Sequence, residues 1–75
     1  MKQILLDITK AIVEDPDSVS VSEKVSGDTV VLELSVAKQD MGRVIGKEGK
    51  IAKSIRTVMR AAAAKENKRV IVDII

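Results

Sequence analysis

The sequence predicts an α+β fold with the element order αββααβ, in which three helices pack on one face of a three-stranded mixed sheet. Apolar residues recur at helical spacing in residues 3–14 and 50–65. Apolar and polar residues alternate in residues 19–25 and 30–36, which is the pattern of strands with one buried face. A strand that returns after two helices normally lies parallel to the strand before them, so the sheet contains both parallel and antiparallel pairs.

The first half of the chain predicts a helix followed by a β-hairpin. The helix is expected over residues 3–14, and Pro16 ends it because proline has no amide donor. The two strands are joined by "SGDT", in which Gly27 and Asp28 favour a tight antiparallel turn. The residues expected on the core face of the helix are Ile4, Leu5, Ile8, Ala11 and Ile12.

The second half predicts two helices and a final strand. Residues 39–45 form a short helix with Asp40 in its first turn, where a negative charge suits the helix dipole. A longer amphipathic helix is expected over residues 50–65. The polar segment "KENKR" then leads into the β-rich run "VIVDII". On the long helix, Ile51, Ile55, Val58, Met59 and Ala62 are expected to face the core, with Lys53, Arg56 and Arg60 roughly opposite.

The composition limits the functions that the chain can have. Its length of 75 residues predicts one domain spanning 1–75, and the 45% of apolar residues can supply a small core. The chain has no His, Cys, Phe, Tyr or Trp. It therefore lacks a side chain that normally titrates near neutrality, a thiolate nucleophile and the usual zinc ligands. We expect no enzyme, no catalytic residue, no metal site, no cofactor and no small-molecule substrate.

The N-terminal segment and the cysteine count bear on location. In "MKQILLDITK" the apolar run before Asp7 is only three residues long, too short for a signal peptide or a membrane span. We therefore expect no membrane insertion. The absence of cysteine fits a reducing compartment, and a cytoplasmic location is expected.

The charges are divided between two parts of the chain. The formal net charge is only +2. Residues 1–37 hold three Lys or Arg against seven Asp or Glu, whereas residues 38–69 hold ten against three. A basic segment next to an acidic one indicates a surface that faces a polyanion, because a merely solvated surface more often mixes the two signs. Chance clustering on a solvated face is the alternative.

Two glycines at the start of the long helix suggest where such a polyanion binds. Gly46 and Gly49 bracket Lys47 and Glu48. Glycine lets the backbone approach a ligand closely, and amides at a helix start can face an anion such as phosphate. The alternative is an ordinary corner at which the glycines only let two helices meet. A nucleotide-binding P-loop is excluded, because Met41 stands where it needs glycine and Glu48 where it needs Ser or Thr.

The segment "RVIGKEGK", residues 43–50, lies between two predicted helices and resembles the GxxG loop of a KH domain of the bacterial, type II arrangement. Through "DPDSVSV" and "DMGRVIGKEGKIAKSIRTVMRAAA", the whole chain resembles the small bacterial single-KH RNA-binding proteins of the KhpA family. The resemblance implies a type II KH fold and single-stranded RNA as the ligand. It also implies a homodimer, or a heterodimer with a larger KH-containing protein. Such a protein would be an RNA chaperone or post-transcriptional regulator that affects cell shape and cell wall biogenesis.

The resemblance also implies roles for individual residues. The loop of residues 46–49 is expected to clamp the backbone of about four nucleotides. Glu48 is expected to weaken binding, because its carboxylate repels phosphate. The strand from Val70 to Val72 is expected to present backbone groups to base edges. The residues expected to bind RNA are Arg43, Ile45, Gly46, Lys47, Glu48, Gly49, Lys50, Lys53, Lys68 and Arg69.

A second interpretation is a protein interaction or dimerisation module whose GxxG loop is vestigial. Leu6 and Val13 lie roughly opposite Ile4 and Ile8 on the predicted first helix, and they are candidates for an interface. Scattered exposed aliphatic side chains are normal in folded proteins and are the alternative explanation. The salt dependence of RNA binding separates the two functions, because binding to phosphates weakens as salt rises.

Overall fold

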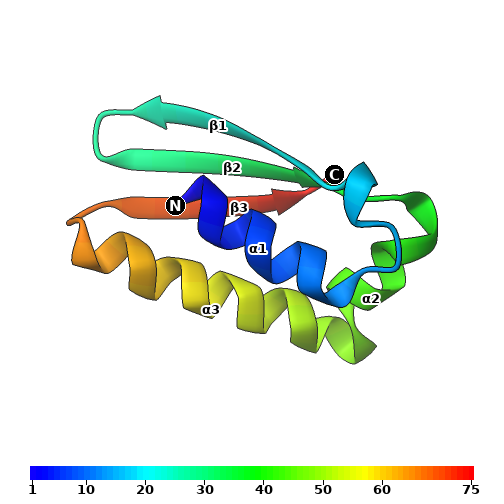
Figure 1. Ribbon diagram of the computed structural model, residues 1–75. Helices are drawn as coiled ribbons and strands as arrows, with labels where there is room; N and C mark the ends of the chain where they lie inside the picture. Colours follow the sequence, from blue (N-terminus) through cyan, green and yellow to red (C-terminus); the bar gives the residue numbers. More distant parts are fainter.

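The computed structural model of the protein describes residues 1–75 and has the predicted α+β element order (Figure 1). The helices are α1 (Lys2–Ile12), α2 (Met41–Ile45) and α3 (Lys50–Lys65), and the strands are β1 (Ser20–Ser26), β2 (Thr29–Ser35) and β3 (Arg69–Ile74). Short 3₁₀ turns lie at Pro16–Ser18, Lys38–Asp40 and Lys47–Gly49. The predicted order is confirmed, with boundaries that differ by at most two residues. None of the helices has the length and apolar character needed to cross a membrane.

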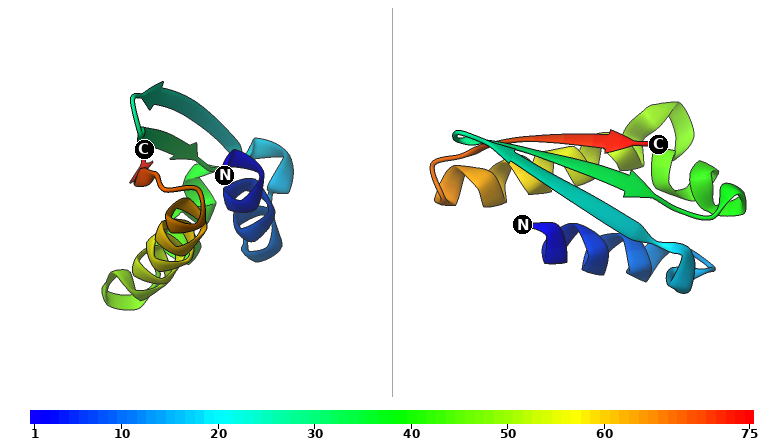
Figure 2. Two further views of the ribbon diagram at one scale, coloured as in Figure 1. Left: turned by 90° about the vertical axis from the view of Figure 1, so that its left-hand side faces the viewer. Right: turned by 90° about the horizontal axis from the view of Figure 1, so that it is seen from above.

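The sheet has the strand order β1-β2-β3, with β1 antiparallel and β3 parallel to the central β2. Val21 lies opposite Leu34 in the antiparallel pair, and Leu32 lies opposite Val72 in the parallel pair. The helices α1 and α3 lie side by side on one face of the sheet, α1 nearer to β1 and α3 nearer to β3 (Figure 2). The crossover from β2 to β3 places α2 and the loop after it at one end of the sheet (Figure 1).

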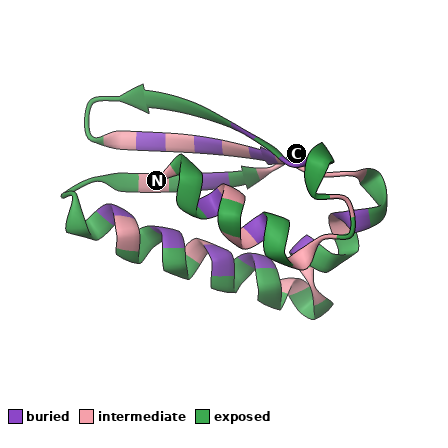
Figure 3. Cartoon of the chain, in the orientation of Figure 1, coloured by how far each residue is buried: buried purple, intermediate pink, exposed green.

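The core lies between the sheet and the two long helices (Figure 3). The central strand β2 alternates as predicted, with every second side chain buried. Each fully buried aliphatic side chain contributes about 1.5–3 kcal/mol to folding. The core cluster consists of Leu5, Val19, Val21, Val30, Leu32, Leu34, Val44, Ile55, Met59 and Val72.

The core face of α3 is rotated by about one residue from the predicted one. Ile51 and Val58, which the apolar pattern assigns to the core, are 40% and 47% exposed. Ala62 is only half-buried. Apolar periodicity assigns the large aliphatic side chains to the core. Alanines occupy two of the buried positions instead, because small side chains let a helix lie close to a sheet. The buried residues of α3 are Ala52, Ile55, Met59 and Ala63.

The core face of α1 departs from the prediction in the same way. Leu5 and Thr9 are buried, whereas Ile4 is exposed. Leu6 and Val13, the candidates for an interface, are half-buried and pack against the core. Part of each side chain is therefore used in packing within the protein, which fits the alternative explanation of these two residues better than an interface.

A buried carboxylate ties the segment after α1 to the start of α2. Asp40 is fully buried and accepts hydrogen bonds from the backbone amides of Glu14 and Asp15 at 3.0 and 3.1 Å. Arg43 Nε lies 4.0 Å from the same carboxylate, and the Arg43 guanidinium also pairs with Glu14. These contacts fix α2, and with it the loop of residues 46–49, relative to α1.

The hydroxyl of Thr9 is buried and has no hydrogen-bond partner. Thr9→Val removes this unsatisfied polar group while keeping the shape of the side chain, so it should raise the free energy of unfolding by about 1 kcal/mol. Urea denaturation followed by circular dichroism measures the change. Thr9→Ser keeps the hydroxyl but loses a methyl group, and it should destabilise the protein. A valine variant that is no more stable than the wild type would contradict the prediction.

Replacing Asp40 should destabilise the fold strongly. Asp40→Ala leaves the amides of Glu14 and Asp15 without their acceptor. Because a hydrogen bond to a charged group contributes about 1.5–3 kcal/mol, the expected loss of unfolding free energy is about 3 kcal/mol. Asp17→Ala is the matched control, since Asp17 is an exposed carboxylate in the same segment and should change the value by less than about 0.5 kcal/mol. Similar losses in the two variants would refute the assigned role of Asp40.

Candidate nucleic-acid interface

The loop between α2 and α3 is built from backbone conformations that most residues avoid. The helix α2 ends where Gly46 N–H donates to the carbonyl oxygen of Gly42 at 2.8 Å, and Gly46 then takes φ 76° and ψ 175°. Glu48 and Gly49 follow with φ values of 58° and 73°. These positive φ values turn the chain through a tight corner, from which α3 starts at Lys50.

Gly46 is required at this corner by space as well as by conformation. A Cβ atom at Gly46 would lie 2.6 Å from Cγ1 of Ile51, closer than packed carbon atoms approach one another. Gly49 differs, because a Cβ there would meet nothing within 4 Å and only its positive φ favours glycine. Glu48 adopts the left-handed conformation without being a glycine, at a cost of about 1–2 kcal/mol.

The two residues between the glycines have open backbone amides. Lys47 and Glu48 are exposed, and no side-chain oxygen accepts a hydrogen bond from either N–H. Gly46 takes the chain out of the helical conformation just before them, so they do not extend the hydrogen-bond ladder of α2. The positive end of the α3 dipole adds to the field at the same place. Open amides at such a position are suited to an anion such as phosphate.

The basic side chains near the loop differ in how free they are. Arg43 is paired with Glu14, so its charge is partly neutralised. No carboxylate lies within ion-pair distance of Lys47, Lys50 or Lys53. These three lysines are therefore the free cations around the loop. No group of three or more acidic side chains is arranged so that it could hold a metal ion.

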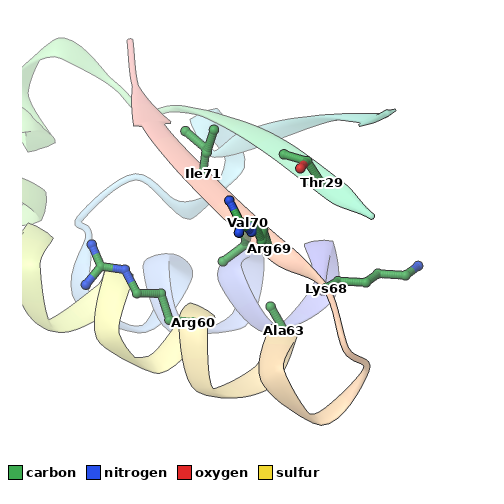
Figure 4. Close-up of a pocket in the computed structure, with 7 residues that line it drawn as sticks. All are labelled: Thr29, Arg60, Ala63, Lys68, Arg69, Val70 and Ile71. Carbon is green, nitrogen blue, oxygen red and sulfur yellow. The ribbon is translucent and has the colours of Figure 1, made fainter. Parts of the chain in front are cut away.

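A groove runs between the C-terminal half of α3, away from the loop of residues 46–49, and the outer edge of β3. Two cavities of about 440 and 260 Å³ lie there, and Arg60 borders both. Lys68 and Arg69 border the larger cavity, and Arg56 borders the smaller one. Figure 4 shows the larger cavity, with Arg60 on α3 beside β3 and Lys68 pointing outward near the start of the strand.

The ten residues predicted to bind RNA fall into two groups. Eight of them lie within residues 43–53, on α2, the loop and the first turn of α3. Ile45 is 40% exposed at the end of α2 and does not border the groove along β3. Lys68 and Arg69 lie beyond the far end of α3.

The groove residues that connect these two groups are Arg56 and Arg60, and neither is in the set predicted to bind RNA. Their spacing of four residues places them on one side of α3, where Arg56 lies within a turn of Lys53 and Arg60 about two turns from it. That spacing is the signal that could have included them. The spacing alone does not indicate an RNA contact, because it matters only if β3 lies beside this side of the helix. The structure shows that it does.

A second groove lies on the opposite side of α3, against α1, and it is apolar. Ile8 and Ile12 of α1 border a cavity of about 220 Å³ together with Ile51 and Val58 of α3. Val58 also borders a neighbouring cavity of about 420 Å³, to which Ile4 and two charged residues at the end of α3 contribute. The single helix α3 therefore separates a basic groove from an apolar one.

Known proteins resemble this chain over its whole length. A family model described as KhpA/KhpB, KH domain, matches residues 2–74. RNA-binding protein KhpA of Clostridium acetobutylicum is 60% identical over 75 residues, which cover 100% of both chains. The protein of the same name from Caldanaerobacter subterraneus subsp. tengcongensis is 52% identical with the same coverage. The one from Chlamydia pneumoniae is 43% identical over 74 residues, which cover 99% of this chain and 95% of that protein. These relatives are named as RNA-binding proteins and not as enzymes.

Solved structures of Era share the fold. The crystal structure of Aquifex aeolicus Era bound to GDP·AlF4⁻ matches 97% of this chain with a TM-score of 0.64 and 20% identity, and this chain spans 28% of that one. Era in complex with MgGDPNP and nucleotides 1506–1542 of 16S ribosomal RNA gives a TM-score of 0.60 and 18% identity over the same shares. At these identities the likeness shows the fold alone. The family match over residues 2–74, together with the full-length relatives, shows that this chain belongs to the KhpA/KhpB family of KH-domain proteins.

Proposed function

We propose that the protein binds single-stranded RNA, and that the loop of residues 46–49 holds the backbone of about four nucleotides. The observation that carries this proposal is the pair of open amides at Lys47 and Glu48, at the start of α3. Backbone amides and lysines contact phosphate and fix the position of a strand without reading its sequence. The free lysines on α3, Lys50 and Lys53, extend the attraction along the helix.

The names of relatives support the same ligand. Two full-length relatives are named RNA-binding protein. The affinity of this chain for RNA should nevertheless be modest. It has no aromatic side chain to stack on a base, and such stacking contributes about 1–3 kcal/mol per base in other single-strand binders.

The proposed role is that of an RNA chaperone or post-transcriptional regulator acting in the cytoplasm. A site for about four nucleotides recognises a sequence so short that it occurs in most transcripts. One domain of this kind therefore selects few RNAs by itself. A regulator built on it needs a second KH domain beside the first, and the apolar groove between α1 and α3 is the surface where we place it.

The second domain is proposed to be another copy of this chain, paired through the α1–α3 groove. The cavity at its centre is lined only by uncharged side chains, so two copies can bring the same surface together without repulsion between like charges. Twofold dimers pair identical patches in this way. Val58 lies at the centre of the proposed contact, because it borders both cavities. The KH domain of a larger protein is the alternative occupant.

Reversing the charge of Lys47 should weaken RNA binding. Lys47→Glu preserves both glycines and changes an exposed side chain, whereas any side chain at Gly46 would collide with Ile51. The dissociation constant for a labelled single-stranded RNA should rise about tenfold, or about 1.4 kcal/mol. The negative slope of log K against log salt should become less steep by about 0.7, which is the contribution of one phosphate on a single strand. Fluorescence anisotropy at several salt concentrations measures both quantities.

Two further variants make this test specific. Lys2→Glu carries the same charge change at the start of α1, which is the end of that helix farther from α2, and should leave binding nearly unchanged (Figure 1). Glu48→Gln removes a carboxylate from the loop, so it should tighten binding, and the gain should shrink as salt rises. If Lys47→Glu binds RNA as tightly as the wild type, the loop is not the contact.

A charge placed in the apolar groove should separate the proposed dimer. Val58→Glu should convert the protein from dimer to monomer in sedimentation velocity runs at micromolar concentration, because a dimer would bury an unpaired carboxylate. Val25→Glu is the matched control, since Val25 is also an exposed valine, at 58% against 47% for Val58, but lies on β1. It should leave the dimer intact. A monomeric wild type would favour the KH domain of a larger partner as the occupant of the groove.

A further inference from the structure

Arg43 differs from the three free lysines around the loop because two carboxylates flank its guanidinium. It lies in the last turn of α2, directly before the loop of residues 46–49. Its Nη2 donates a hydrogen bond to the carboxylate of Glu14, and its Nε lies 4.0 Å from the carboxylate of Asp40. The lysines have no such partner. The arginine next to the loop is therefore already occupied by acidic side chains of the same chain.

The two carboxylates differ in how easily an incoming anion can replace them. Asp40 is fully buried and accepts hydrogen bonds from two backbone amides, which hold it in place. The side chain of Glu14 is 61% exposed, and its only hydrogen bond is the one from Arg43. Ion pairs between exposed side chains are weak, since water solvates both partners well when they separate. Glu14 is therefore the partner that an anion can displace, while Asp40 keeps its place beside Arg43.

A phosphate group of RNA has the chemistry to take the place of the Glu14 carboxylate. Arginine binds carboxylates and phosphates through the same planar fork of N–H groups. The side chain of Arg43 is 54% exposed, so solvent reaches its outer N–H groups. In the proposed function the strand lies at the loop of residues 46–49, which follows Arg43 within about one turn. A backbone phosphate at the loop and the carboxylate of Glu14 are thus rivals for one guanidinium.

We propose that Glu14 is an internal competitor of RNA, which holds Arg43 until a phosphate of the bound strand displaces it. This proposal rests on the RNA-binding function proposed above. The contact lowers the affinity for RNA, because binding must break one ion pair at Arg43 to form another. Glu14 differs in this respect from Glu48, which has no cationic partner and repels the strand directly. The effect of Glu14 therefore depends on a single arginine.

Glu14→Gln tests the competition without disturbing the fold, because the backbone amide of Glu14, and not its side chain, donates to Asp40. The neutral amide of glutamine holds a guanidinium less strongly than a carboxylate does. Fluorescence anisotropy at low salt should therefore show that this variant binds a labelled single-stranded RNA about threefold more tightly than the wild type. In an Arg43→Gln background the same change should bring no gain, because no guanidinium is left to release. Circular dichroism checks that each variant is folded.

Asp17→Asn is the matched control for charge. Asp17 is an exposed carboxylate in the same segment as Glu14, and it forms no ion pair. Its neutralisation changes the net charge by the same amount but releases no arginine. It should therefore tighten RNA binding far less than Glu14→Gln does.

The salt dependence shows whether Arg43 contacts phosphate. In the Glu14→Gln background, Arg43→Gln should make the negative slope of log K against log salt less steep by about 0.7, and a role of Arg43 in the fold alone would leave that slope unchanged. An unchanged slope would overturn the proposal, as would a gain in Glu14→Gln no larger than in Asp17→Asn, or a gain that persists without Arg43. RNA binding that depends on Lys47 would still stand in each case. Binding of RNA by neither the wild type nor Glu14→Gln would overturn the proposed function as well.

Discussion

The contact between Gly46 and the side chain of Ile51 is the constraint on which the candidate site depends. Because Gly46 has no side chain, α3 can start directly against the end of α2. The chain can make that corner only by leaving the helical conformation, which leaves the amides of residues 47 and 48 open. Asp40 holds the other end of α2 through two backbone hydrogen bonds. The open amides are therefore a consequence of packing on both sides of the loop.

The helix α3 serves three surfaces at once. Its period of about 3.6 residues per turn leaves room for separate stripes along one helix. One stripe, which includes Met59, packs in the core, and a second, with Arg56 and Arg60, borders β3. The third stripe includes Val58 and borders α1. Ile51 belongs to this last side and also lies against Gly46, although it is 40% exposed. The proposed contacts to RNA and to a partner thus fall on different sides of α3.

The sequence predicted the element order and the loop but not the contacts between distant segments. The change from helical to alternating spacing was unambiguous, and the glycine pair marked the corner between two helices. The core faces of α1 and α3 were predicted only in part: Leu5, Ile55 and Met59 are buried as expected. Thr9 and two alanines of α3 were missed, because they are buried by close packing that apolar periodicity does not register. A hydrogen bond from Arg56 Nε to the carbonyl oxygen of Val72 joins residues 16 apart in the sequence. Only the crossover that places β3 beside α3 reveals it.

The separation of the two grooves bears on the proposed function, because it would let two weakly binding domains act together on one RNA. With no aromatic stacking, a single groove must release short RNAs readily. In a dimer formed through the α1–α3 side, both basic grooves stay open, and one RNA chain can occupy them together. The second binding event is then intramolecular, with an effective concentration that can reach about the millimolar range when the RNA between the two bound sequences is short enough. Affinity and selectivity would thus depend on the spacing between two short nucleotide sequences as much as on either sequence. A dimer that buried the loop of residues 46–49 in its interface could not bind RNA in this way.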